Sequence, residues 1–211
     1  MKKLFLLGLL ILTSVSLKAQ SLSAEMQKVY DACYAMSLAV GSANTAGLKS
    51  ANDVFRKLET KEMNVRFETE DIPSLDGHFV WDEVFVDSLV AGRDVRKFAQ
   101  QYAKSRLARS TSQKGTIVTK TCMARAESGA KFSFKCRGRQ ELSVIAEPGG
   151  MITLRIHDRT NDVWYNDDEN VKSGQRSRSK IFDLPQDKLS ILEVEVINCS
   201  KNDISFVVIS N

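Results

Sequence analysis

The spacing of apolar residues changes once along the chain, near residue 115. In residues 23–40 apolar side chains recur at steps of three and four, which predicts an amphipathic helix with Ser23 as its N-cap. Turn and capping residues follow in the stretch "GSANTAG", and a second apolar stripe then predicts another helix. The stripe of this second helix consists of Leu48, Ala51, Phe55 and Leu58. We expect the two helices to form a hairpin, because only a short link joins them.

Strand and helix patterns alternate between the second helix and residue 115. Residues 63–73 and 78–90 are rich in β-forming residues and predict two strands, the first of them ended by Pro73. Residues 93–108 predict a third helix with one apolar side and one basic side. The basic side consists of Arg93, Arg96, Lys97 and Lys104. This side could dock an acidic partner or a phosphate surface, and a solvated exterior would explain it as well.

From Gly115 onward, apolar and polar residues alternate with a period of two. A series of short strands without an intervening helix predicts an antiparallel β-sandwich. One face of the penultimate strand carries no charge and should lie in the core. The residues of this face are Leu192, Val194 and Val196. We therefore expect an α+β protein, in which a helical section with a short sheet (residues 20–114) packs onto an antiparallel, jelly-roll-like β-sandwich (residues 115–211).

The first residues have the layout of a secretory signal peptide, which we place at residues 1–19. Lys2 and Lys3 precede an apolar run, and small or polar residues lead to Ala19, after which we expect cleavage. The apolar run is too short to span a membrane, and no later run is long enough. The short segments are typical of bacterial export, so the mature chain should be periplasmic or secreted. Loss of three lysines lowers the formal net charge from +4 to +1, which leaves no electrostatic footprint for nucleic acid.

The chain contains four cysteines, which are Cys33, Cys122, Cys136 and Cys199. In an oxidising compartment an even number of cysteines permits disulfides. Two strands are predicted around Gly129, and a three-residue hairpin loop there would place Cys122 opposite Cys136 as a disulfide. Two ordinary buried thiols would suit the sequence as well, and Cys33 and Cys199 are interpreted as packing residues. No Cys/His spacing typical of zinc is present, so no metal site is expected from the cysteines.

Several features of residues 131–209 follow one another in the order seen in a known family. An aromatic pair, Phe132 and Phe134, comes first. Next is a strand that alternates Leu142, Val144 and Ala146. The strand "LRIHDRTND" ends in a polar turn, and the apolar strands "LEVEVIN" and "SFVVI" make a final hairpin. The segment resembles the bacterial pre-peptidase C-terminal domain. This resemblance implies a small jelly-roll sandwich on an exported protein, with a non-catalytic role in targeting, folding or binding.

Two histidines limit the catalytic chemistry that the chain could support. His78 lies next to a glycine in a predicted turn. His157 precedes Asp158 in a strand, where neighbouring side chains point to opposite faces, so these two residues cannot act as a dyad with each other. The sequence motifs of serine hydrolases, zinc proteases, P-loop proteins and dinucleotide-binding proteins are absent. We expect no enzymatic activity, and an unrecognised hydrolase is the third and last option for the function.

Residues 161–180 combine two aromatic residues, a run of acids and amides, and a run of bases. Trp164 or Tyr165 could stack on a sugar ring. Neighbours in an extended segment point in opposite directions, so one of the two should be exposed and the other buried. The oxygens of the acids and amides could hold calcium. The candidate ligand-binding residues are Trp164, Tyr165, Asn166, Asp167, Asp168 and Asn170.

Of these alternatives, we interpret the stretch itself as a solvated hairpin end, in which bases offset the acids across two strands. These bases are Lys172, Arg176, Arg178 and Lys180. The predicted function is a secreted or periplasmic, non-catalytic binding or interaction module that binds a glycan or a protein. The alternative is a structural or accessory subunit of a cell-surface assembly, in which the basic helix face and the hairpin ends meet a partner. No cofactor is expected, with calcium in this loop as an open alternative, and the oligomeric state is left open.

Overall fold

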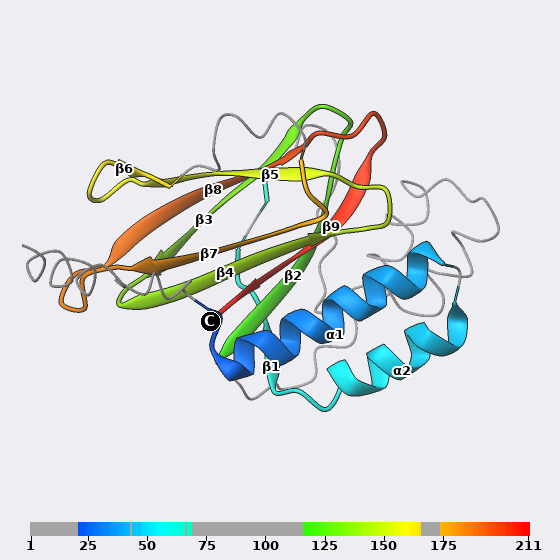
Figure 1. Ribbon diagram of the computed structural model, residues 1–211. Helices are drawn as coiled ribbons and strands as arrows, with labels where there is room; N and C mark the ends of the chain where they lie inside the picture. Colours follow the sequence, from blue (N-terminus) through cyan, green and yellow to red (C-terminus); the bar gives the residue numbers. More distant parts are fainter. Residues whose placement is uncertain (1–20, 43, 66, 69–115, 166–173) are drawn as a thin grey trace, which may run out of the picture.

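A computed structural model describes the fold over residues 21–42, 44–65, 67–68, 116–165 and 174–211. Within these ranges, two helices lie against one side of a β-sandwich made of two sheets (Figure 1). The protein therefore has the α+β architecture that the sequence predicts. In the described part of the chain, no helix is both long enough and apolar enough to cross a membrane.

The two helices are α1 (Ala24–Gly41) and α2 (Thr45–Phe55). Each begins with a side-chain cap. The Ser23 hydroxyl accepts a hydrogen bond from the Met26 N–H at 3.3 Å, and the Asn44 side chain accepts one from the Gly47 N–H at 2.9 Å. The apolar stripes of the two helices are buried against each other and against one sheet, as predicted. The sheet residues in this contact are Ile117, Ile145, Val207 and Ile209.

The strands of the five-stranded sheet, in spatial order, are β1 (Thr60–Glu62), β2 (Ile117–Ala124), β9 (Ile204–Ser210), β4 (Arg139–Ala146) and β7 (Ser177–Asp183). Those of the four-stranded sheet are β3 (Gly129–Cys136), β8 (Ser190–Asn198), β5 (Ile152–Asp158) and β6 (Val163–Trp164). From β2 onward the chain changes sheet at each connection except that between β5 and β6. This interleaved order is that of a jelly roll, so the predicted sandwich is confirmed.

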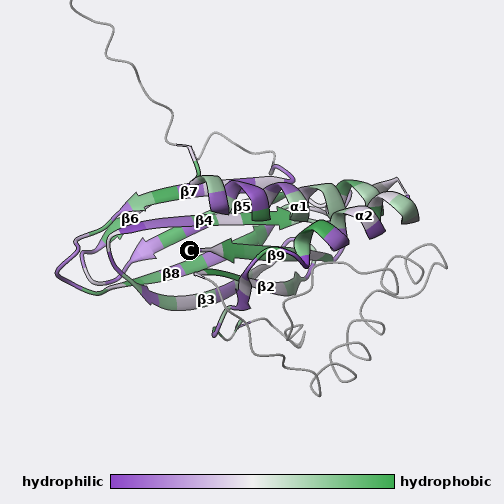
Figure 2. Cartoon of the chain, turned by 90° about the horizontal axis from the view of Figure 1, so that it is seen from below, coloured by the Kyte–Doolittle hydropathy of each residue, from purple (hydrophilic) through white to green (hydrophobic). Residues whose placement is uncertain are grey.

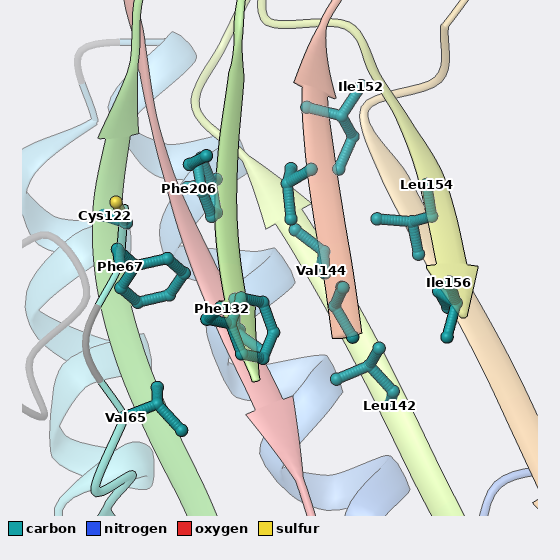
Figure 3. Packing of buried hydrophobic residues seen from close by; sticks show 14 of the residues in the cluster. Val65, Phe67, Cys122, Phe132, Leu142, Val144, Ile152, Leu154, Ile156 and Phe206 are labelled. Carbon is teal, nitrogen blue, oxygen red and sulfur yellow. The ribbon is translucent and has the colours of Figure 1, made fainter. Parts of the chain in front are cut away.

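The inward faces of the strands fill the space between the two sheets (Figure 3). The uncharged face of β8 is fully buried there, as predicted. β9 lies in the middle of the five-stranded sheet and is buried along its whole length, because the helices cover its other face. Its mostly hydrophobic sequence, visible in Figure 2, follows from this position between two apolar layers.

Residues 60–65 and 67–68 close one side of the sandwich. The first of them form β1 alongside β2, and Glu68 pairs with Lys131 of β3 in the opposite sheet. Phe67 packs between the sheets, with its ring centroid 4.9 Å from that of Phe132 and 6.0 Å from that of Phe206. The segment therefore covers edges of both sheets, which would otherwise expose unpaired backbone groups.

The predicted disulfide between Cys122 and Cys136 is wrong. Cys122 lies in β2 opposite Phe206, whereas Cys136 lies in β3 opposite Ser190, so the two thiols belong to different sheets. All four cysteines of the chain are free thiols. The residues around Gly129 form no hairpin, because the chain passes there from one sheet to the other. For the same reason, β8 and β9 are not the final hairpin that the family resemblance implies.

Candidate functional site

The hairpin of β5 and β6 lies at the end of the sandwich far from α2 (Figure 1 and Figure 2). The buried carboxylate of Asp158 holds its turn. This carboxylate accepts hydrogen bonds from the Thr160 N–H at 2.9 Å, the Asn161 N–H at 3.3 Å and the Asn161 Nδ2 at 2.7 Å. The Thr160 hydroxyl in turn accepts a hydrogen bond from the Ile191 N–H at 2.9 Å, which ties the turn to β8. Burial by itself would raise the pKa of Asp158, but the hydrogen bonds outweigh it and hold this pKa below its ordinary value.

Trp164 is the exposed aromatic residue of this hairpin. It pairs directly with His157 of β5, and the two rings stack with centroids 4.3 Å apart and planes 6° apart. The His157 Nε2 lies 2.9 Å from the Asp162 Oδ1, which fixes the imidazole under the indole. Trp164 is nevertheless 57% exposed. One face of the indole therefore lies on the imidazole, and the exposed area belongs to the rest of the ring.

Tyr165 points into the sandwich instead. Its ring meets that of Phe182 edge-on, with centroids 5.1 Å apart, and its N–H donates to the Ile156 carbonyl at 2.8 Å. Burial, together with the nearby Asp158 carboxylate, raises the pKa of its phenol. The expectation that one of the two aromatic residues is exposed and the other packed inside is confirmed. Tyr165 is thus partly buried against the core, and its role as a ligand contact stays a prediction.

The outward face of the four-stranded sheet surrounds Trp164 with polar side chains. The strand register places Trp164, His157, Glu193 and Ser133 in one row across the sheet. The neighbouring row consists of Arg155, Glu195 and Lys131. Within the part of the chain that the structure describes, both helices cover the other sheet, so this face is left to solvent.

Ion pairs connect the side chains of this face. The Glu195 carboxylate lies 3.5 Å from the Lys131 Nζ and 3.6 Å from the Arg155 Nη1. The Glu193 carboxylate lies 3.6 Å from the Arg159 Nη1. The side chains of both arginines remain more than 60% exposed. The face thus combines one open aromatic ring with charged groups that water still reaches, which is an arrangement suited to binding a polar ligand with some apolar surface.

Several candidate residues lie outside the described residues. They are Asn166, Asp167, Asp168 and Asn170 of the acidic stretch, and Arg93, Arg96, Lys97 and Lys104 of the basic helix. The calcium site and the partner-docking helix therefore stay predictions. Among the residues that the structure does describe, no group of three or more His, Cys, Asp or Glu side chains could hold a metal ion.

Of the bases in this stretch, Lys172 lies outside the described residues, and the other three do not pair with β6. Arg178 and Lys180 belong to β7, which pairs with β4 in the five-stranded sheet, while β6 belongs to the other sheet. Arg176 reaches α1, where its Nη2 donates to the Ser37 carbonyl at 3.5 Å. The interpretation of residues 161–180 as the two arms of one hairpin is therefore wrong.

The sequence interpretation missed Arg155 and Arg159, which the structure places on the same face as Trp164. A signal for them was present. Because side chains alternate between the two faces of a strand, Arg155 and His157 lie on one face of β5, and Arg159 is the next residue at the same spacing. The sequence did not show that β6 pairs with β5. This pairing places Trp164 directly beside His157.

No protein-family model and no curated protein matches the chain. Among solved structures, the chain resembles TmCBM61 in complex with β-1,4-galactotriose, with 12% identity, a TM-score of 0.27, and 51% of this chain and 76% of that chain covered. It also resembles a family two carbohydrate esterase from Cellvibrio japonicus, with 14% identity, a TM-score of 0.25, and 43% and 26% covered. A third is Peruvianin-I, a cysteine peptidase from Thevetia peruviana latex, with 14% identity, a TM-score of 0.28, and 45% and 50% covered. The chain thus spans half of Peruvianin-I and about a quarter of the esterase. Similarities at this level concern the fold and carry no argument about function.

Proposed function

We propose that the protein is an exported, non-catalytic binding module whose ligand is a glycan, bound on the outward face of the four-stranded sheet around Trp164. The observation that carries this proposal is the indole itself, which is 57% exposed yet held flat against His157. Exposed tryptophan is unusual on a surface without a partner, because it leaves a large apolar area in water. The signal-peptide layout of residues 1–19 supports export.

The chemistry of the face suits a sugar. A sugar ring has an apolar face of C–H groups and a rim of hydroxyl groups. The indole can cover the first, and the charged side chains around it can form hydrogen bonds with the second. Two further apolar side chains, Leu189 and Ile191, are exposed where β8 begins, close to the hairpin turn. They extend the apolar surface beyond a single ring.

The rigidity of the site also supports binding. The His157–Asp162 contact holds the imidazole, and the buried Asp158 holds the turn, so Trp164 is positioned before a ligand arrives. A ligand then loses little free energy to the ordering of side chains. The alternative of an accessory subunit rested on the hairpin ends together with the basic helix, and this helix lies outside the described residues. A protein ligand for the Trp164 face is an outcome that the experiment below would reveal.

The test is a panel of neutral and acidic polysaccharides, with binding followed by calorimetry and by the melting temperature of the protein. Binding to the folded state alone must raise the melting temperature. We expect Trp164→Ala to weaken binding about fivefold or more, since a stacked aromatic contributes on the order of 1–3 kcal/mol. Val54→Ala on α2 is the control, because Val54 is an apolar residue of comparable exposure (50%) on the helical side of the molecule.

Three outcomes decide the proposal. Binding lost in Trp164→Ala and kept in Val54→Ala supports it. Glycan binding that is indifferent to Trp164 overturns the assignment of the site. The absence of binding to every glycan, together with capture of a protein that Trp164→Ala abolishes, overturns the assignment of the ligand class.

A further inference from the structure

We propose that the glycan bound by this face is acidic, and that Arg155 and Arg159 hold its carboxylate or sulfate groups on either side of Trp164. This inference rests on the proposed function and names the ligand class of the same site. It comes from the positions of the two arginines, from the single ion pair that each of them makes, and from the exposure of their side chains.

The two arginines flank the aromatic stack along one line. Arg155 and His157 are two residues apart on the outward face of β5, and Arg159 is the next residue in this series. Arg159 is the first residue of the turn that follows β5. Its N–H donates to the Ile191 carbonyl at 2.9 Å, and its Nη1 lies 3.6 Å from the outward-facing Glu193 carboxylate, which places its side chain on this face. Same-face residues of a strand are roughly 7 Å apart, so Arg155 lies on one side of His157 along β5, and Arg159 lies on the other side at the turn. A sugar ring on Trp164 would therefore have a cation in reach from each neighbouring position.

Each guanidinium makes only a weak interaction with the protein. Within the described residues, each makes one ion pair at 3.6 Å, a separation longer than a hydrogen bond. The side chains are 61% and 63% exposed for Arg155 and Arg159, respectively. A guanidinium can bind a carboxylate or a sulfate through two parallel N–H donors, which is a stronger interaction than either present ion pair. An acidic ligand would thus gain contacts that a neutral ligand cannot make.

The charges of this face are balanced overall. Among the described residues, four cations (Lys131, Lys135, Arg155 and Arg159) accompany four carboxylates (Glu68, Glu193, Glu195 and Asp162). Glu195 lies between Lys131 and Arg155, Glu193 lies next to Arg159, and Asp162 lies against His157. An acidic ligand would therefore be held by the individual guanidinium groups and not by a net positive field, so the face suits spaced acidic groups with sugar rings between them better than a densely charged polymer.

The experiment compares polymers with the same backbone that differ in charge. Polygalacturonate is set against its methyl ester, and dextran sulfate against dextran, with affinities measured by calorimetry at low and at high salt. We expect at least one acidic polymer to bind about tenfold or more tightly than its neutral partner, with affinity falling as salt rises. Polygalacturonate and dextran sulfate together distinguish a carboxylate-bearing ligand from a sulfated one.

The variants separate a built site from general charge attraction. Arg155→Gln with Arg159→Gln should abolish the preference for the acidic polymer. Lys49→Gln with Lys57→Gln removes the same charge from exposed positions at and just after α2 and should leave the preference intact. Equal loss in both double variants would overturn the inference, because it would show a non-specific charge effect. Equal, Trp164-dependent binding of acidic and neutral polymers would overturn the inference and leave the proposed function standing. A lack of binding to any of the four polymers or to the wider panel would overturn both.

Discussion

The Glu141 carboxylate of β4 accepts two hydrogen bonds from Ser23, one from its backbone N–H at 2.8 Å and one from its hydroxyl at 2.9 Å. Ser23 is the N-cap of α1, so a buried side chain of the sheet holds the beginning of the helix. The Arg139 Nε donates to the other carboxylate oxygen at 3.0 Å, and the Arg139 Nη2 donates to the Ser21 carbonyl at 3.0 Å. A negative charge at this helix end also stabilises the helix dipole. These contacts fasten the helical layer to the sandwich.

Replacement of Glu141 by Gln should therefore lower the free energy of unfolding by about 1–3 kcal/mol near neutral pH, because buried hydrogen bonds to a charged group are lost. Burial by itself would raise the pKa of Glu141, but the hydrogen bonds from Ser23 and Arg139 outweigh it and hold this pKa below its ordinary value. A lowered folded-state pKa means that the stabilisation is present at neutral pH and is lost as the pH falls through the acid range. Denaturant unfolding of the wild type and the variant at several pH values measures this. A difference that stays constant down to strongly acidic pH would contradict the prediction.

Glu147 should give the opposite pH dependence. Burial raises its pKa to about 7, against the hydrogen bond that its Oε2 accepts from the Ser205 hydroxyl at 2.6 Å. The folded state thus holds the proton more tightly than the unfolded state, so this group lowers stability progressively from about pH 4.5 to pH 7, by up to roughly 3 kcal/mol. Glu147→Gln should remove that slope and raise Tm relative to the wild type at pH 8. Glu193→Gln, on the solvent-facing side of the other sheet, is the control, and equal slopes in all three proteins would refute the assignment.

Asp158 should matter for both the hairpin and the ligand. Asp158→Ala removes the buried acceptor of three hydrogen bonds and should cost about 1–3 kcal/mol of stability, since hydrogen bonds to a charged group are lost from the turn. Hydrogen exchange of the backbone in residues 157–165 should become faster, and glycan affinity should fall even though Asp158 does not face the ligand. Asp158→Asn, which keeps one acceptor oxygen, should lie between the wild type and the alanine variant. Unchanged exchange in the hairpin would show that the carboxylate does not hold the turn.

The cysteines should react as free thiols that differ in access. In denaturant without reductant, a thiol reagent should titrate all four of them. In the folded protein Cys199, which is half-buried, should react first, whereas Cys33, Cys122 and Cys136 are buried. Burial also raises the pKa of the Cys33 and Cys136 thiols, which lowers the amount of reactive thiolate. Only two reactive thiols in denaturant would restore the disulfide that the structure excludes.

The sequence predicted those parts of the fold that depend on local periodicity. Met26 and Leu48 are buried on the helix faces where the apolar stripes place them, and Val194 is buried on the uncharged face of β8. Ser23 could be identified as the N-cap because its hydroxyl serves the nearest N–H groups. Each of these features depends on residues within one or two turns or along one strand. The alternation of side chains along an extended segment also predicted that Trp164 and Tyr165 would point to opposite faces.

The pairing of strands could not be predicted in this way. A turn signal such as the one near Gly129 shows where the chain changes direction, but it does not show whether the next strand joins the same sheet or the opposite one. In this jelly roll most connections cross to the opposite sheet, so Cys122 and Cys136 are separated although they lie symmetrically about the turn. For the same reason, the sequence identified only part of the candidate site. Trp164 was identified from its own chemistry, whereas Arg155 and Arg159 gain their significance only from the β5–β6 pairing.

The central position of β9 has a consequence for the order in which the protein can fold. β2 and β4 do not pair with each other, and both use β9 as their shared neighbour. Until β9 has been synthesised, the five-stranded sheet lacks its central strand, and the surface on which the two helices pack is incomplete. Such long-range pairing makes folding slow, because much of the chain must be brought together before contacts repay the lost entropy. Nearly the whole sequence must therefore be present before the sandwich closes, so the earlier strands keep their edges unpaired until the last strand arrives between them.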